Sequence, residues 1–316
     1  MAANPIAAGP AAAFSGAAAR PFDANAVAAT LRRLARQPHA PWLHGEVARR
    51  MAERLEVIRL KPELILDWWG FLGSGADVLE AAYPKARRIV VEPDDGWLAR
   101  SRAAAATPWW SAGKWRRGSV EVVGEQAELR GGAQLIWANM MLHAVADPPA
   151  LMARWERLLA VDGFVMFSCL GPGSLRELQA LYKRLGWLAP AGSFIDMHDL
   201  GDMLVHAGFA DPVMDQETLT LRWDSPLALL AELRLLGGNT APDRMAGLRT
   251  PRWRERLLRE LDSLRGSDGR IGLGFEVAYG HAFKAAPRLR ADTPTTVSLD
   301  DMRAMVRAPR LRSGRA

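Results

Sequence analysis

The chain has 316 residues, of which 49% are hydrophobic and 24% are charged, with a formal net charge of +6. This composition is typical of a globular protein, and we expect no membrane span because no run of about 18 apolar residues occurs. The single cysteine, Cys169, excludes an internal disulfide and a metal held by several cysteines. A reducing, cytoplasmic location is the expectation.

The two ends differ in composition from the rest of the chain. Residues 1–21 are rich in Ala, Gly and Pro, lack the early positive charge of a signal peptide, and predict a disordered arm. Residues 285–316 carry an excess of Arg and predict a flexible basic tail, with binding of an acidic partner or nucleic acid as the alternative. We expect one domain over residues 22–284.

Elements of two kinds alternate through the first part of this domain. Helical spacing predicts two helices over 26–57, separated at Pro38 and Pro41. Short apolar runs bounded by Gly or Pro then alternate with helical stretches, which is the pattern of βαβ units. The predicted strands are 63–69, 87–93, 119–124, 133–139 and 163–171, with helices at 94–104 and 148–160.

The second part continues with a helix over 172–186. A further helix is capped by Asp196 or Asp199 and ends at Gly208, and a tight turn leads to a strand at 217–223. Two amphipathic helices, 225–238 and 251–265, and a last strand, 275–284, follow. The pattern predicts an α/β, Rossmann-like fold: a seven-stranded, mostly parallel sheet with helices on both faces and an antiparallel edge.

A glycine-rich turn follows the first predicted strand. It holds Gly70, Gly73 and Gly75, and Glu92 ends the second strand. This is the layout of an adenosine-binding site, in which glycines let the backbone approach the ligand and the carboxylate accepts the ribose hydroxyls. The alternative is an ordinary strand-to-helix turn.

The same stretch, DWWGFLGSG, resembles motif I of class I S-adenosylmethionine methyltransferases, LDxGxGxG. The resemblance implies S-adenosyl-L-methionine as cofactor and places Asp67 in its loop. Trp68 and Trp69 depart from the motif, but a strand alternates faces, so one ring can pack in the core. Two indole rings filling the crevice would argue against an enzyme.

Two further positions follow from this resemblance. Glu125, just past the third strand, matches the acid that the family places near the adenine amino group; a solvated loop charge is the alternative. Asn139 ends the fourth strand and faces the expected cleft, or else caps a turn.

Later segments carry a closer resemblance. SFIDMHDLGDMLVHAGFADPVMD (193–215), with MFSCLGPGSLRELQ before it and FEVAYGHAF after it, resembles the malonyl-acyl-carrier-protein O-methyltransferases of biotin synthesis. The likeness covers most of 22–284. It implies O-methylation of a free carboxylate on a small or carrier-bound substrate, without a general base or a metal, because a carboxylate is already a nucleophile. A monomer is expected.

The resemblance also suggests pocket residues. His143 stands near the position of a family Gln, and Phe194, His44 and His198 are further candidates; for each histidine a purely structural role is the alternative. A set of basic residues, Arg49, Arg50 and Arg54, meets an acidic carrier protein or, as the favoured alternative, forms a solvated helix face.

Two other functions remain open from the sequence. The Trp- and Arg-rich stretch 108–118 fits an RNA methyltransferase, although Asn139 lacks the Pro-Pro-aromatic sequence of amino-directed base methyltransferases, and nucleic acid is an unlikely partner. The irregular turn fits a degenerate, non-catalytic binding protein that keeps the fold.

Overall fold

A computed structural model of the chain describes residues 22–106, 118–245 and 247–286. The described residues up to Ala285 belong to one compact unit. The predicted arm, 1–21, lies outside the described residues, as do nearly all of the predicted tail and of the stretch 108–118. The proposed division of the chain into an arm, a domain and a tail therefore stays a prediction.

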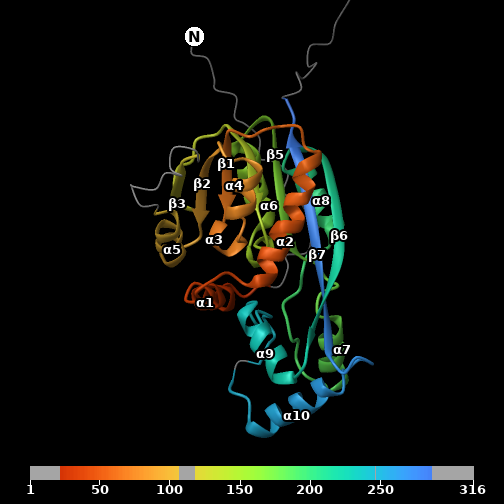
Figure 1. The fold of residues 1–316 in the computed structure, drawn as a ribbon. Coiled ribbons are helices and arrows are strands. Elements are labelled where there is room, and N and C mark those ends of the chain that lie inside the picture. The colour runs from red at the N-terminus through yellow and green to blue at the C-terminus, as the bar shows by residue number, and fades with distance from the viewer. Residues whose placement is uncertain (1–21, 107–117, 246, 287–316) are drawn as a thin grey trace, which may run out of the picture. The chain divides into compact units, whose positions relative to one another are not determined.

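Seven strands form one sheet in the order β3-β2-β1-β4-β5-β7-β6 (Figure 1). The strands are β1 Leu64–Trp68, β2 Arg87–Glu92, β3 Val120–Gly124, β4 Ala133–Ala138, β5 Leu159–Leu170, β6 Phe209–Trp223 and β7 Ile271–Lys284. Strands β1 to β5 pair with one another in parallel, whereas β7 runs antiparallel to β5 and β6. The predicted parallel sheet with an antiparallel edge is confirmed.

Helices cover both faces of this sheet. Their bounds are α1 Ala24–Leu34, α2 Trp42–Glu53, α3 Gly70–Gly73, α4 Ala76–Ala82, α5 Asp95–Ala105, α6 Pro148–Leu158, α7 Arg176–Arg184, α8 Met197–His206, α9 Pro226–Leu235 and α10 Pro251–Asp262, with short 3₁₀ turns η1 Arg54–Val57 and η3 Leu142–Ala144. Buried side chains of α2 and α4 belong to one core cluster, and those of α5, α6 and α8 to another.

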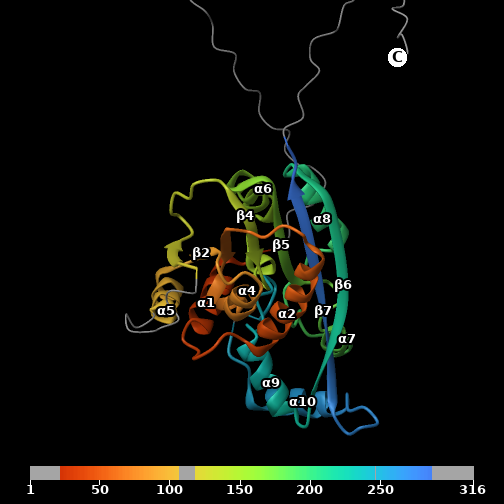
Figure 2. The same cartoon turned by 45° about the horizontal axis from the view of Figure 1, so that its top comes forward.

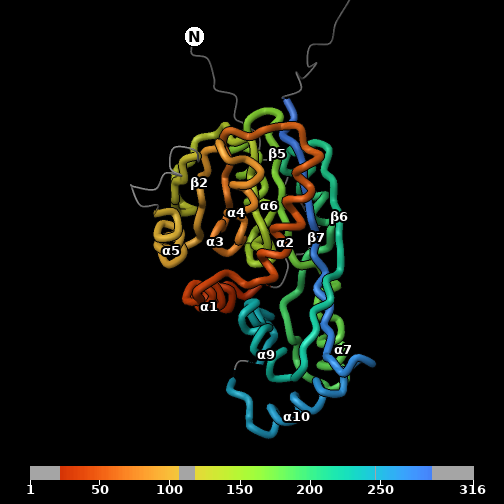
Figure 3. The backbone as a smooth tube through the Cα atoms, viewed as in Figure 1, coloured from red at the N-terminus to blue at the C-terminus, as the bar shows by residue number. Residues whose placement is uncertain are grey.

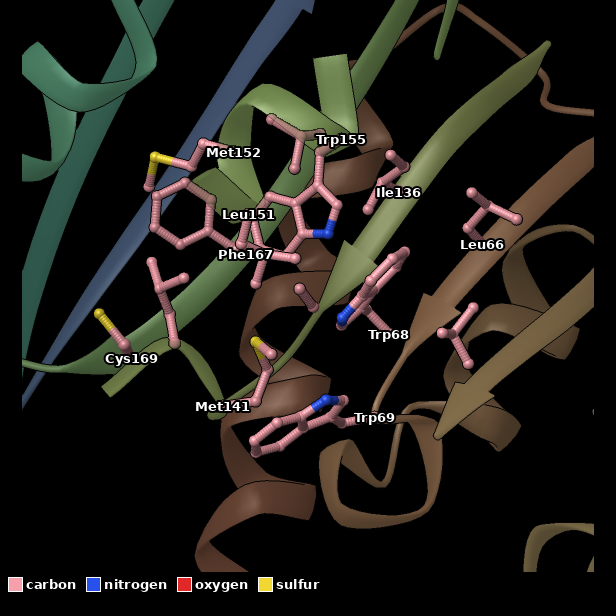
Figure 4. Close-up of a cluster of buried hydrophobic side chains, with 14 of the residues drawn as sticks. Leu66, Trp68, Trp69, Ile136, Met141, Leu151, Met152, Trp155, Phe167 and Cys169 are labelled. Carbon is pink, nitrogen blue, oxygen red and sulfur yellow. The ribbon is translucent and has the colours of Figure 1, made fainter. Parts of the chain in front are cut away.

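The period-two alternation of strand side chains separates these two cores. Along β1, Leu66 and Trp68 face the cluster that holds Trp155 of α6, whereas Ile65 faces the cluster that holds Leu79 of α4 (Figure 4). Both faces of the strand are buried because helices cover both, as expected of a parallel sheet. Cys169 is buried in β5, in the core position that its apolar surroundings predict.

The predicted helix before β6 has the expected boundary. The side chain of Asp196, one of the two predicted caps, accepts a hydrogen bond from the His198 amide at the start of α8. No helix in the described part of the chain is both long and apolar enough to cross a membrane.

The largest difference from the sequence reading is the length of β6. It begins at Phe209, directly after Gly208, and not at residue 217. Asp211 adopts φ 49°, and the pairing with β7 shifts register between Ala210 and Val213. Asp211 and Pro212 signal a turn in sequence, but a bulge on an edge strand accommodates both, so the strand continues through them.

Two strands carry a helical insertion away from the main sheet. Beyond the neighbouring strands, β6 and β7 continue as a long ribbon, and α9 and α10 lie together at its end (Figures 1, 2 and 3). Helix α1 meets this insertion, because the carbonyl oxygen of Gly237, just past α9, accepts hydrogen bonds from Thr30 (3.2 Å) and Arg33. The contact encloses a cavity between α1, α9 and the strand ends.

Candidate active site

The carboxyl ends of β1, β2 and β4 bring several predicted site residues together. The amide of Phe71, in the glycine-rich turn, donates to Glu92 Oε1 at 2.9 Å. On its other side, the turn is held by Asn139, whose Nδ2 donates to the carbonyl of Gly73 at 2.6 Å. Thus hydrogen bonds connect the turn to Glu92, at the end of β2, and to Asn139, just after β4, and these residues lie together as the sequence predicts.

Glu92 is fully buried. Its Oε1 accepts hydrogen bonds from Phe71 N and from the Ser101 hydroxyl (2.5 Å), whereas Oε2 is buried without a hydrogen-bond partner in the described structure. Burial raises the pKa of this carboxyl to about 7, and the hydrogen bonds from Ser101 and Phe71 only partly oppose the rise. Glu92 therefore holds its proton up to near neutral pH.

This raised pKa predicts a pH-dependent stability. The folded pKa of about 7 lies above the ordinary value of 4.5, so the stability present at low pH is lost as the pH rises from 4.5 to 7. Glu92→Gln removes the titration, and we expect it to exceed the wild type in unfolding free energy by about 3 kcal/mol at pH 8.

Urea unfolding of both proteins at pH 5 and pH 8 measures this difference. The advantage of Glu92→Gln should shrink strongly at pH 5. His44, whose pKa burial lowers to about 4, titrates in both proteins, so its contribution cancels in the comparison. An equal difference at the two pH values would contradict the assigned state of Glu92.

The glycines of the turn are required by close packing within the chain itself. A Cβ at Gly70 would lie 2.6 Å from Asp67 Oδ2, and one at Gly75 would lie 2.5 Å from the indole nitrogen of Trp137. At Gly73 the nearest atom would be the Asn139 carbonyl oxygen, at 3.3 Å. Contacts between these glycines and a cofactor stay a prediction.

Asp67 lies beneath this turn and is buried. Burial raises its pKa to about 6, although the guanidinium of Arg88, 3.9 Å away, opposes the rise. One carboxylate oxygen, Oδ1, has no hydrogen-bond partner in the described structure. Asp67 thus adds a second buried acid to the group around Glu92.

Both tryptophans of the turn pack in the same core cluster, which is one ring more than strand alternation accounts for. Trp68 packs edge-on against Trp155, with ring centroids 6.0 Å apart, and its Nε1 donates to Glu125 Oε1 at 3.2 Å. Trp69 leaves the strand with φ 55°, which turns its ring back into the same core. Figure 4 shows the Trp69 indole beyond the carboxyl ends of the strands, beside Met141.

The aromatic side chains of the turn are packed against other parts of the chain. Trp69 is only 5% exposed, and the ring of Phe71 packs against Trp97 with centroids 5.4 Å apart and lies under the guanidinium of Arg100. Oε2 of the Glu92 carboxyl group has no hydrogen-bond partner in the described structure, which suits a ribose hydroxyl. The group fits an adenosyl ligand chemically, but in this conformation Glu92 is fully buried and bonded to the turn through the Phe71 amide.

Both the nitrogen and the oxygen of the Asn139 side-chain amide form hydrogen bonds with other residues of the chain. Its Nδ2 donates to the carbonyls of Gly73 and His44 (2.7 Å), and its Oδ1 accepts from the Ser168 hydroxyl at 2.6 Å. The residue is fully buried. It therefore ties α2, the glycine-rich turn and β5 together, and contact with a ligand stays a prediction.

A cavity of about 460 Å³ lies next to this group. His143 and Phe194 both line it and meet edge-on, with ring centroids 6.0 Å apart. His44 also lines it and is buried, with Nδ1 2.9 Å from the Leu72 carbonyl oxygen. His198 is exposed beside Asp196 and is not among the residues lining the cavity, so the structure does not bring it to the pocket.

The three basic residues of α2 and η1 form ion pairs with acids of the same chain. Arg49 pairs with Glu46 and Glu53, Arg50 pairs with Glu46 and Glu217, and Arg54 pairs with Asp215. These partners favour the solvated-face interpretation over a site for an acidic carrier protein.

Sequence reasoning missed two groups of functional interest. Ser101, which donates to Glu92, carries only the weak signal of lying on the buried side of α5. Arg33 and Arg234 line the cavity, but they come from helices about 200 residues apart, and no local pattern joins them. Among the described residues, no group of three or more His, Cys, Asp or Glu is placed to hold a metal ion.

Comparisons with known proteins agree with this architecture. Residues 63–211 match a family model described as a methyltransferase domain. A malonyl-[acyl-carrier protein] O-methyltransferase of Gallionella capsiferriformans is 38% identical over 254 residues, covering 79% of this chain and 87% of the relative. The corresponding protein of Laribacter hongkongensis is 35% identical over 263 residues, covering 82% and 88%.

A solved structure shares the fold. The YcgJ protein of Bacillus subtilis superimposes with a TM-score of 0.51 at 12% identity, over 77% of this chain and 99% of that chain. At this identity the likeness concerns the fold alone, whereas the sequence similarities above extend over about four-fifths of the chain.

Proposed function

The chain belongs to the malonyl-[acyl-carrier protein] O-methyltransferase family, and from this premise we propose that it methylates the free carboxylate of a malonyl group on an acyl-carrier protein, in biotin synthesis. It is an S-adenosylmethionine-dependent methyltransferase with the class I fold, and S-adenosyl-L-methionine is the methyl donor of its family. The observation that carries the proposed substrate is the similarity to named relatives over most of the chain.

Methyl transfer to a carboxylate requires few catalytic groups from the protein. When bound, the cofactor supplies an electrophilic methyl group. A carboxylate is already a nucleophile near neutral pH, so the chain needs no general base and acts by orienting the substrate and excluding water. The buried surroundings of the pocket, with His143 against Phe194, suit that role.

Two acids, Glu92 and Glu125, are proposed to hold the cofactor. Glu92 offers Oε2, which is buried without a partner, to a ribose hydroxyl. Glu125, just past the end of β3, is proposed to meet the adenine amino group; a Cβ added at the neighbouring Gly124 would have no atom within 4 Å. Because Glu92 is fully buried and the Phe71 amide ties it to the turn, binding requires this turn to move.

The cavity is proposed to receive the acyl-pantetheine part of the substrate. It extends from His143 and Phe194, near the strand ends, to α1 and α9 of the insertion. Its lining is mainly aliphatic, including Leu31, Leu175 and Leu230, which suits a long and weakly polar chain. A monomeric enzyme stays a prediction.

Methyl transfer to malonyl-acyl-carrier protein from labelled S-adenosylmethionine tests the proposal. We expect a labelled methyl ester on the malonyl protein and none on acetyl-acyl-carrier protein, because only the former has a free carboxylate. Growth of a biotin-requiring strain that lacks its own methyltransferase supplies the cellular test.

Two negative results have different meanings. No ester despite cofactor binding would point to another acceptor. No binding of S-adenosylmethionine, by calorimetry, to the wild type or to a variant with an opened turn would favour the non-catalytic alternative.

A further inference from the structure

The cavity is lined mostly by apolar side chains, together with neutral polar residues such as Thr30, His44 and Tyr182 and a few charged ones. Three charged side chains line it, namely Asp23, Arg33 and Arg234. Asp23 is neutralised, because its Oδ2 lies 2.5 Å from Nη1 of Arg244. The two remaining guanidiniums give the cavity a net positive charge.

Arg33 is held in place but not fully satisfied. Its Nη2 donates to the carbonyl of Gly237, at the end of α9. Its Nε is buried and has no hydrogen-bond partner in the described structure. A buried guanidinium N–H without an acceptor is costly, so this atom is a candidate donor to a bound ligand.

Arg234 adds a like charge from the last turn of α9. Burial, and then repulsion from Arg234, lower the pKa of Arg33, and both side chains line the same cavity. Arg234 forms no ion pair with any acid that the structure describes. The carbonyls at the end of α9 offset part of the repulsion, and an anion between the two cations would offset the rest.

We propose that Arg33 and Arg234 form a binding site for an oxyanion, a carboxylate or a phosphate, at the end of a ligand whose chain lies in the apolar cavity. The inference rests on the proposed function, since an acyl-pantetheine substrate carries such groups at its two ends. Guanidinium groups suit this task because their planar N–H donors match the oxygens of carboxylates and phosphates.

Direct binding of three probes to the full chain tests the site without methyl transfer. Malonyl-pantetheine carries a carboxylate, acetyl-phosphopantetheine carries a phosphate, and acetyl-pantetheine carries neither. We expect calorimetry to show that at least one anionic probe binds about tenfold or more tightly than acetyl-pantetheine. The probe that shows this preference identifies which anion the site takes.

Variants then assign the preference to the two arginines. Arg234→Gln removes an exposed side chain with little risk to folding and should abolish the preference for the anionic probe. Arg33→Gln should do the same, and Arg33→Lys should restore part of it. Arg32→Gln is the matched control, because Arg32 neighbours Arg33, is exposed and is not among the residues lining the cavity.

Several results would overturn the site. These are equal binding of all three probes by the wild type, retention of the preference in Arg234→Gln, or an equal loss in Arg32→Gln. If the wild type prefers an anionic probe but does not methylate malonyl-acyl-carrier protein, the proposed function is refuted and the anion site is retained.

Discussion

Trp69→Gly is expected to bind S-adenosylmethionine at least about tenfold more tightly than the wild type. The Trp69 indole packs beyond the strand ends, and the turn that begins with it is tied to the buried Glu92 by the Phe71 amide. Removing the ring takes away packing that holds this turn in place over Glu92, and glycine tolerates the φ of 55° that costs a tryptophan about 1 kcal/mol. Isothermal titration calorimetry measures the affinity.

The same variant loses a large buried ring, so we expect it to be less stable by a few kcal/mol. Trp155→Ala is the control, because Trp155 is equally buried in the same cluster but belongs to α6. It should lose stability without gaining affinity. A wild type that binds the cofactor as tightly as Trp69→Gly, or an equal gain in Trp155→Ala, would show that the turn does not limit binding.

Asn139→Ala is expected to lower the free energy of unfolding by about 3 kcal/mol. The substitution removes three buried hydrogen bonds at once, leaving the carbonyls of His44 and Gly73 and the hydroxyl of Ser168 without this partner. Because the amide joins α2, the glycine-rich turn and β5, we expect the turn to loosen as well. Urea unfolding at pH 7 measures the loss.

Asn239→Ala supplies the matched control. Its side chain also donates to a carbonyl, that of Ala189 (2.7 Å), and accepts from an amide, that of Ala241 (2.8 Å), but Asn239 is exposed. Water replaces such hydrogen bonds, so the loss should stay below about 1 kcal/mol. Equal losses at the two sites would mean that burial of the Asn139 network contributes nothing.

The sequence predicted most of the sheet correctly because its signals are local. Apolar runs such as that of β2 end at a proline or glycine, and amphipathic stretches separate them, so the parallel order and the antiparallel edge followed from general rules of α/β folds. The start of β6 was missed because Asp211 and Pro212 are turn formers in isolation. Their place in a bulge depends on pairing with β7, which no local pattern shows.

The sequence predicted where the site residues lie better than it predicted the conformation of the turn that covers them. The approach of Glu92 to the glycine-rich turn was expected, because parallel strands end at the same edge. The conformation of the turn was not expected. Strand alternation does not extend to Trp69, because this residue leaves the strand at a positive φ. The ring's destination depends on packing in a core cluster built from residues far apart in the chain.

By itself, the sequence determined the fold class, the family resemblance and the residues that converge at the strand ends, because period-two and helical patterns specify which side of each element is buried. Only the tertiary structure decided that both indoles share one core, that the Glu92 carboxyl is buried with its pKa raised to about 7, and that Arg33 and Arg234 line the same cavity. These outcomes depend on distances between segments far apart in the chain, and burial, charge repulsion and free space exist only once those segments are packed together.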